Sequence, residues 1–191
     1  YRIGVIRMDA IPGGQLPMAQ QILESMKIQG AAATLPDALM NFWKAAENRP
    51  ESLSRTLLCI DEAHYLAEEN GLYLVHYLTN LRIVNRRSQT EEPLFTVILA
   101  GTPELLPAMR RDPSLYQRVQ MLYDLPPFSK EQTVAYVQHH MRAVGGDLWA
   151  FDPGALDAIF RFSSGLPRKI NLLCDTSLML GFAGKLTQIQ E

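Results

Sequence analysis

The sequence is poor in the features that would assign it to a specialised class of protein. Its two cysteines, Cys59 and Cys174, lie far apart in the chain, which argues against a disulfide framework, so we expect both thiols to be reduced. Neither sign of charge dominates, because 18 basic side chains stand against 20 acidic ones, and this argues against a polybasic coat for membranes or nucleic acids. No stretch approaches the ~20 consecutive apolar residues of a membrane-spanning helix.

What the sequence does contain is typical of a globular protein. Apolar residues make up 47% of its 191 positions, enough to bury a sizeable core and too many for a disordered chain. Apolar runs of strand length alternate with helical patterns until the proline pair at 126–127, after which only helical patterns follow. We therefore expect an α/β core with a mostly parallel sheet over residues 1–127 and a three-helix appendage over residues 128–191.

The patterns also place the individual elements of the core. Strands are expected over residues 1–8, 56–60, 94–100 and 119–125. The two middle runs are uninterrupted apolar stretches, which are typical of strands covered on both faces of a parallel sheet. Between them, we expect a long helix from Leu72 to Ile83 and then a charged connection over residues 85–92.

Two adjacent carboxylates follow the first of these buried runs. Asp61 and Glu62 come directly after the apolar residues 57–60, and in open α/β sheets ligands bind beyond the carboxyl ends of the strands. A nucleotide hydrolase needs one carboxylate near Mg²⁺ and another that orients and deprotonates the attacking water, and neighbouring residues at a strand end can supply both. The alternative is an acidic helix start, because Asp and Glu are also common there.

Three further polar residues are candidates for the same site. Thr102 follows the second buried run, where its hydroxyl can hold the attacking water or cap the helix after Pro103. Arg118 precedes the last expected strand. Arg168 lies in the first turn of the final helix, where the helix dipole disfavours a cation and a bound polyphosphate would offset that disadvantage. The alternative for Arg168 is a solvated side chain.

Four segments together resemble the AAA+ ATPases of the ExeA/GspA type. They are LLCIDE at 57–62, which is similar to a Walker B strand, AGTPEL at 100–105, which is similar to sensor 1, the Arg118 segment leading into LPPFS at 125–129, and GLPRKINLLCD at 165–175. The last segment is the most specific, and the resemblance extends over nearly the whole chain. Proteins of this family couple ATP hydrolysis to placing secretion or pilus machinery in bacterial envelopes.

The resemblance implies a role for each candidate in the binding and hydrolysis of ATP with Mg²⁺. Asp61 would bind Mg²⁺ through water, and Glu62 would be the catalytic base. Thr102 would be sensor 1. Arg168 would be sensor 2, carried by a helical lid formed from residues 128–191.

The resemblance also implies partners. Arg118 matches the arginine that one subunit offers to the nucleotide of its neighbour, with Arg110 and Arg111 as nearby alternatives, so a homo-oligomer is expected. The implied partners are secretion or pilus-assembly proteins. The implied location is the cytoplasm, or the inner membrane through segments outside these residues.

The family's phosphate-binding loop is absent from the sequence. No Gly-x-x-x-x-Gly-Lys-Ser/Thr occurs, and the glycine-rich residues 11–14 have no following Lys-Ser/Thr. In the family this loop follows a central strand, between those expected here at 94–100 and 119–125. Because unpaired buried strand edges are costly, we hypothesise that the central strand and the loop precede Tyr1 in a longer polypeptide.

Two other functions remain open from the sequence. Arg82, Arg86 and Arg87 form a basic cluster, which is commonly a solvated loop but can contact nucleic-acid phosphates, as in a transposition-type DNA-binding ATPase. A catalytically inactive scaffold that uses the fold for protein contacts is the other possibility. The tetrad at 61–64 matches a helicase box, but the other helicase motifs do not follow it. The four histidines show no metal-ligand spacing, so we expect these histidines at the surface or its boundary.

Overall fold

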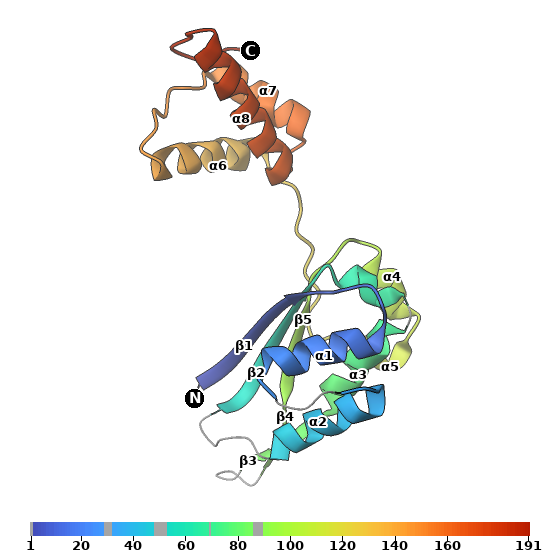
Figure 1. Ribbon diagram of the computed structural model, residues 1–191. Helices are drawn as coiled ribbons and strands as arrows, with labels where there is room; N and C mark the ends of the chain where they lie inside the picture. Colours follow the sequence, from blue (N-terminus) through green and yellow to red (C-terminus); the bar gives the residue numbers. More distant parts are fainter. Residues whose placement is uncertain (1, 29–31, 48–52, 69, 86–89) are drawn as a thin grey trace. The chain divides into compact units, whose positions relative to one another are not determined.

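The structure, a computed structural model, describes residues 2–28, 32–47, 53–68, 70–85 and 90–191. The chain divides into two compact units, Tyr1–Leu122 and Tyr123–Glu191, which are drawn in Figure 1 and described one at a time below. Each unit has its own cluster of buried hydrophobic residues. None of the helices in the described ranges is long and apolar enough to cross a membrane.

A parallel sheet of three strands forms the centre of the first unit. Its strands are β1 (Arg2–Asp9), β2 (Leu53–Asp61) and β5 (Phe95–Leu99), in the order β1-β2-β5. In the register, Met8 lies opposite Ile60, and Ile60 lies opposite Leu99. The predicted α/β class with a parallel sheet is therefore confirmed, and β2, which carries the acidic pair, is the middle strand.

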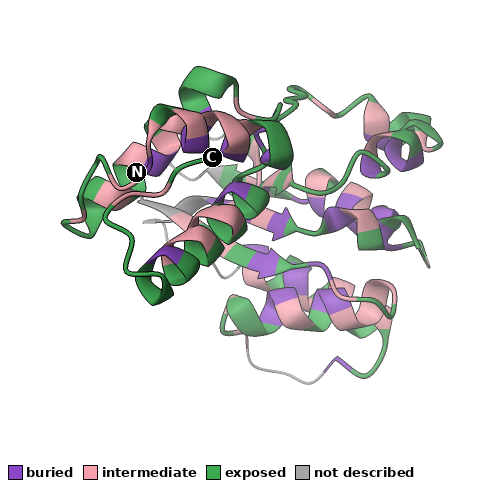
Figure 2. Ribbon diagram, turned by 90° about the horizontal axis from the view of Figure 1, so that it is seen from above, coloured by how far each residue is buried: buried purple, intermediate pink, exposed green. Residues whose placement is uncertain are grey.

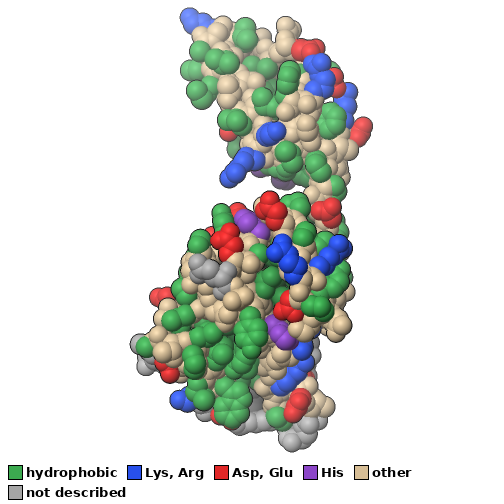
Figure 3. Space-filling view, turned by 90° about the vertical axis from the view of Figure 1, so that its right-hand side faces the viewer, with side chains coloured by type: hydrophobic (Ala, Val, Ile, Leu, Met, Phe, Trp, Pro, Cys, Tyr) green, Lys and Arg blue, Asp and Glu red, His purple; other side chains and the backbone are tan. Residues whose placement is uncertain are grey.

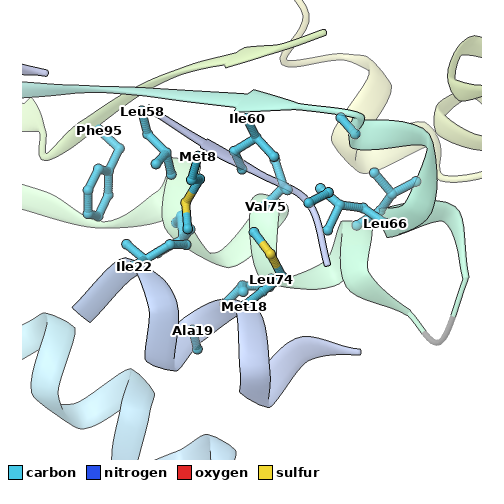
Figure 4. Packing of buried hydrophobic residues seen from close by; sticks show 14 of the residues in the cluster. Met8, Met18, Ala19, Ile22, Leu58, Ile60, Leu66, Leu74, Val75 and Phe95 are labelled. Carbon is cyan, nitrogen blue, oxygen red and sulfur yellow. The ribbon is translucent and has the colours of Figure 1, made fainter. Parts of the chain in front are cut away.

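Helices lie between these strands and after the last of them. They are α1 (Gln15–Ser25), α2 (Leu35–Glu47), the 3₁₀ helix η1 (Ala63–Ala67), α3 (Gly71–Asn80), α4 (Leu105–Arg110) and α5 (Pro113–Tyr116). Apolar residues at helical spacing direct α1 into the core, because Met18, Ile22 and Leu23 are all buried on one stripe. Figure 4 shows residues of α1 and α3 packed beneath Leu58 and Ile60 of β2.

The two faces of the sheet are covered unequally. Leu58 and Ile60 are buried at 0% and 1% exposure, whereas Val5 of β1 and Ile98 of β5 are 54% and 50% exposed. This alternation along the strands can be followed in Figure 2. The apolar run at 56–60 predicted cover on both faces, but among the described residues one face of the strands is the better covered.

The prediction of one long helix over 72–83 was correct as far as Asn80 and wrong beyond it. The helix α3 ends at Asn80, and Leu81 takes an extended backbone conformation. The strand β3 (Arg82–Asn85) then pairs antiparallel with β4 (Thr90–Pro93), so part of the expected charged connection is a strand. The β-branched Ile83 and Val84 explain the change, because such residues favour a pleated strand over a helix.

The prediction of a strand over residues 119–125 was also wrong. No strand is assigned there, and Met121, Tyr123 and Leu125 are 83%, 77% and 84% exposed. Alternating apolar residues form a strand only when they pair with a sheet and bury one face. Within the described residues, the sheet consists of β1, β2 and β5 alone, so this segment has no strand beside it.

Three helices form the second unit: α6 (Lys130–Ala143), α7 (Pro153–Ser163) and α8 (Pro167–Ala183). The start of α6 is fixed by a capping box, in which the Ser129 hydroxyl accepts the Gln132 N–H and the Gln132 side chain accepts the Ser129 N–H. The turn before α8 requires Gly165, which has φ +72°, and a Cβ there would lie 2.0 Å from the Phe128 carbonyl oxygen. This turn sets where α8 begins.

The two cysteines lie in different units. Cys59 belongs to β2 and Cys174 to α8, and both are free thiols. Burial, reinforced by the negative charge of Asp175, raises the pKa of the Cys174 thiol to about 11. Because the thiolate is the reactive form, Cys174 is a structural rather than a reactive thiol at neutral pH.

Candidate functional site

The carboxyl ends of the three parallel strands are tied together by backbone hydrogen bonds. The Ala10 N–H donates to the Asp61 carbonyl over 2.8 Å, which joins the end of β1 to that of β2. The Ala100 N–H donates to the Ile60 carbonyl over 2.9 Å, and the Ala63 N–H donates to the Ala100 carbonyl over 2.8 Å. The residues that follow β2 and β5 are therefore held close to one another.

Asp61 and Glu62 occupy this edge, as the sequence indicated. The Glu62 N–H donates to Asp61 Oδ1 over 2.8 Å, which fixes the Asp61 carboxylate against the backbone. Glu62 has a left-handed backbone, with φ 50° and ψ 31°. This conformation costs a non-glycine residue about 1–3 kcal/mol, and residues strained in this way cluster at functional sites. Both carboxylates are exposed, so both can reach a ligand.

The 3₁₀ helix η1 begins directly after Glu62 and brings His64 to the same place. The Nδ1 atom of His64 lies 3.5 Å from Oε2 of Glu62. Acidic and histidine side chains gather at this end of the first unit (Figure 3). His64 is partly buried, in agreement with its expected place at the surface or its boundary. Its position beside Glu62 was not expected, although the tetrad at 61–64 placed the two residues close together in the sequence.

Thr102 lies just beyond β5. Its hydroxyl donates a hydrogen bond to Glu104 Oε2 over 2.9 Å, and the side chain is exposed. Thr102 does not cap the following helix α4 with its side chain, because Glu104 is the N-cap residue and makes no side-chain cap bond. The sequence left two roles open for the Thr102 hydroxyl, and the structure shows that capping α4 is not one that it performs.

Gly101 allows the close approach of the two strand ends. A Cβ atom at position 101 would lie 3.0 Å from the backbone nitrogen of His64 and 3.3 Å from that of Ala63. Contacts this short force one of the two segments to move. A small residue is thus required where β5 passes the turn that carries Glu62.

We expect Gly101→Val to destabilise the first unit by about 1–3 kcal/mol, because the added side chain overpacks the contact with His64. The free energy of unfolding can be measured by urea denaturation, with Trp149 replaced by Phe so that the fluorescence reports on Trp43 in the first unit. The matched control is Ala100→Val at the preceding, exposed position, with an expected change within about 0.5 kcal/mol. Equal losses in the two variants would contradict the close approach.

Arg118 follows the short helix α5 and is exposed, with its backbone N–H bonded to the Leu115 carbonyl over 3.0 Å. Asp112 caps α5, because its Oδ1 accepts the Ser114 and Leu115 N–H groups at 3.1 Å. A hydrogen bond from the Ser114 hydroxyl, followed by that from the Leu115 N–H, lowers the pKa of Asp112 below its ordinary value. The cap therefore fixes the backbone that presents Arg118.

The two rival arginines lie at the end of α4. The guanidinium carbon of Arg110 lies 5.8 Å from the centre of the Tyr116 ring, in a cation–π geometry. Arg111 is the C-cap residue of α4 and is exposed. Within the part of the chain that the structure describes, Arg118 has no aromatic or acidic partner, whereas Arg110 is held against Tyr116.

Arg168 belongs to the second unit. It is exposed in the first turn of α8, directly after Pro167, and Leu166 at the N-cap makes no side-chain cap bond. The N–H groups at this helix start thus lack the side-chain oxygen that commonly satisfies them. Asp61, Glu62, Thr102 and Arg118 lie in the first unit.

The donor set fits Mg²⁺ bound together with a phosphate ligand better than a metal held by protein alone. In the described part of the chain, no group of three or more His, Cys, Asp and Glu side chains is placed to hold a metal ion. Mg²⁺ commonly uses only one or two carboxylates, with waters and substrate phosphates completing its shell. Asp61, fixed by the Glu62 N–H, provides such a carboxylate.

Only part of the predicted basic cluster can be placed. Arg82 is exposed at the start of β3, on the antiparallel pair β3-β4. Arg86 and Arg87 lie outside the described residues.

The chain is similar in sequence to two curated proteins, although no family model matches it. It is 35% identical over 131 residues to general secretion pathway protein A of Aeromonas hydrophila, a match that covers 68% of this chain and 23% of that protein. It is 26% identical over 140 residues to MJ0774 of Methanocaldococcus jannaschii, described as an uncharacterized HTH-type transcriptional regulator, covering 71% of this chain and 32% of that protein. The chain thus spans a third or less of either relative.

Solved structures share the fold. The Aeropyrum pernix ORC1 protein, solved in complex with DNA, matches with a TM-score of 0.72 at 12% identity, covering 100% of this chain and 48% of that one. The ADP form of the Aeropyrum pernix ORC2 protein matches with a TM-score of 0.69 at 16% identity, covering 98% and 50%. At such identities these matches describe the fold alone.

Proposed function

Because this chain is an AAA+ module of the ExeA/GspA type, we propose that it supplies the catalytic carboxylates of an ATP-hydrolysing site. One observation carries the proposal: the middle strand β2 ends in two adjacent carboxylates with different surroundings. Asp61 is fixed by a backbone N–H, whereas Glu62 turns away in a left-handed conformation. The fixed Asp61 carboxylate suits a metal ligand, and the Glu62 carboxylate suits a general base.

In this proposal, Glu62 accepts the proton of the water that attacks the γ-phosphate. Asp61 holds Mg²⁺ through a bound water, and Thr102 orients the attacking water from the end of β5. Mg²⁺, when bound with ATP, neutralises charge on the phosphate oxygens. Glu62 remains exposed and so can reach the water.

Two arginines complete the proposed site. Arg168 contacts the γ-phosphate from the start of α8, where a polyanion offsets the unfavourable position of a cation at a helix N-terminus. Arg118 reaches the nucleotide of a neighbouring subunit. The active form would then be a homo-oligomer, because each site is incomplete without the adjacent copy.

The biological role that we propose is assembly or remodelling of a bacterial secretion or pilus complex. The support is the 35% identity to general secretion pathway protein A. The module would act in the cytoplasm or at the inner membrane, with secretion or pilus-assembly proteins as partners.

A DNA-binding ATPase regulator is the second candidate. It is favoured by the exposed Arg82 on β3 and by the similarity to a protein described as an HTH-type regulator. Binding to duplex DNA that weakens with salt and on neutralising Arg82, Arg86 and Arg87 would support this candidate.

The proposed activity is tested with the complete polypeptide that contains these residues. We expect ATP turnover in the presence of Mg²⁺, loss of turnover on chelating the metal with EDTA, and a specific activity that rises with protein concentration as subunits associate. Phosphate release measures turnover, and titration with labelled ATP measures nucleotide binding. If neither binding nor turnover is seen, the catalytically inactive scaffold is the correct description.

A further inference from the structure

His64 lies beside Glu62 with its ring largely withdrawn from water. Its side chain is only 17% exposed, and its Nδ1 atom faces Glu62 Oε2 at 3.5 Å. Among the described residues, this buried nitrogen has no hydrogen-bond partner. Leaving a buried polar atom unsatisfied costs about 1–3 kcal/mol, so such an atom at a site calls for a functional explanation.

The surroundings hold the ring in place. The backbone before it is fixed by the hydrogen bond from the Ala63 N–H to the Ala100 carbonyl. The ring of Tyr65 lies against it, with 4.3 Å between the ring centres and 36° between the ring planes, and Gly101 approaches from the end of β5. The His64 ring is therefore confined, whereas the Glu62 side chain is 56% exposed and free to adjust.

A small movement of the Glu62 carboxylate would complete a hydrogen bond. The present separation of 3.5 Å exceeds the 2.7–3.2 Å that is typical of N–H···O bonds by only a few tenths of an ångström. Catalytic hydrogen bonds are often long in ligand-free structures and tighten when substrate binds. The geometry therefore allows a hydrogen bond between His64 Nδ1 and Glu62 Oε2 to form when the carboxylate moves.

We propose that His64 is a positioning residue for Glu62, an inference that rests on the proposed function. With its proton on Nδ1, the ring donates to Glu62 Oε2 and fixes the carboxylate plane. The other oxygen, Oε1, is then free to accept the proton of the attacking water. His64 itself takes no proton from the water and contacts neither ATP nor metal.

The test compares three variants of the complete polypeptide. In His64→Asn the amide nitrogen takes the place of Nδ1, whereas in His64→Gln it takes the place of Nε2, and His64→Ala has no donor. We expect His64→Asn to retain kcat within about 3-fold, and His64→Gln and His64→Ala to lose about 10- to 100-fold, with KM for ATP unchanged. His76→Ala, at a partly buried histidine on α3, is the matched control and should leave kcat unchanged.

Each outcome decides the matter. Wild-type kcat in His64→Ala overturns the inference but leaves the proposed function standing. An equal loss of kcat in His64→Asn and His64→Ala does the same. A rise in KM with unchanged kcat also overturns it, because positioning of the base acts on turnover. If the wild-type protein hydrolyses no ATP, the proposed function fails and the inference falls with it. Melting temperatures of all variants show whether a loss of kcat follows a loss of folded protein.

Discussion

Replacing Glu62 with glutamine is expected to lower ATP turnover by about 10²–10⁴-fold, the usual contribution of a general base. Glutamine keeps the size and the hydrogen-bonding reach of the side chain but cannot accept a proton from water. ATP and Mg²⁺ should bind as before, because Asp61 and its bond from the residue 62 N–H are unchanged. Phosphate release by the complete polypeptide measures turnover, and labelled ATP measures binding.

The matched control for this substitution is Glu68→Gln. Glu68 is an exposed carboxylate that follows η1 and lies outside the strand ends, so its neutralisation should leave turnover unchanged. If Glu62→Gln hydrolyses ATP at the wild-type rate, Glu62 is not the base and the assignment of the acidic pair is wrong.

Replacing Arg118 with alanine is expected to lower turnover by about 10³–10⁵-fold, the range associated with an arginine that stabilises the transition state of phosphoryl transfer. Arg110→Ala and Arg111→Ala should have much smaller effects, because Arg110 is engaged with Tyr116. If Arg118→Ala keeps near wild-type turnover and Arg110→Ala or Arg111→Ala loses it, then Arg110 or Arg111, and not Arg118, is the arginine that acts on the neighbouring nucleotide.

Mixing two inactive variants shows whether Arg118 acts between subunits. An equimolar mixture of Glu62→Gln and Arg118→Ala proteins should regain part of the wild-type turnover, because some interfaces then pair an intact Glu62 with an intact Arg118. Each variant alone remains inactive. If Arg118 served the nucleotide of its own subunit, no site in the mixture would hold both residues and activity would not return.

The sequence correctly predicted a buried strand that ends at the acidic pair. An apolar run followed by two carboxylates indicated both features, because a buried strand leaves a strong local pattern. The end of β2 at Asp61 and the parallel pairing of β2 with β1 and β5 agree with the expected sheet. The roles assigned to Asp61, Glu62, Thr102, Arg118 and Arg168 stay predictions.

Features that depend on pairing between distant segments could not be predicted in this way. The alternation at 119–125 indicated a strand, but a strand needs a partner, and none of the described strands lies beside it. Conversely, the β3-β4 pair forms where a helix end and a charged connection were expected. In both cases the local pattern was compatible with more than one structure, and the neighbouring segments decided which one formed.

The position of His64 was hidden for a related reason. Its place beside Glu62 results from the left-handed backbone at Glu62 and from the bond that ties Ala63 to the end of β5. Neither feature leaves a periodic pattern in the sequence. Gly101 gave the one local hint, because a glycine at a strand end can mark a close approach of two backbones.

The most direct test is a structure of the complete polypeptide with Mg²⁺ and a non-hydrolysable ATP analogue. We predict that the Asp61 carboxylate lies within hydrogen-bond reach of a water on Mg²⁺. Glu62 should face a water in line with the γ-phosphate, and the Arg168 guanidinium should contact a γ-phosphate oxygen. A nucleotide bound away from the end of β2, with Asp61 and Glu62 touching neither metal nor the attacking water, would contradict this account.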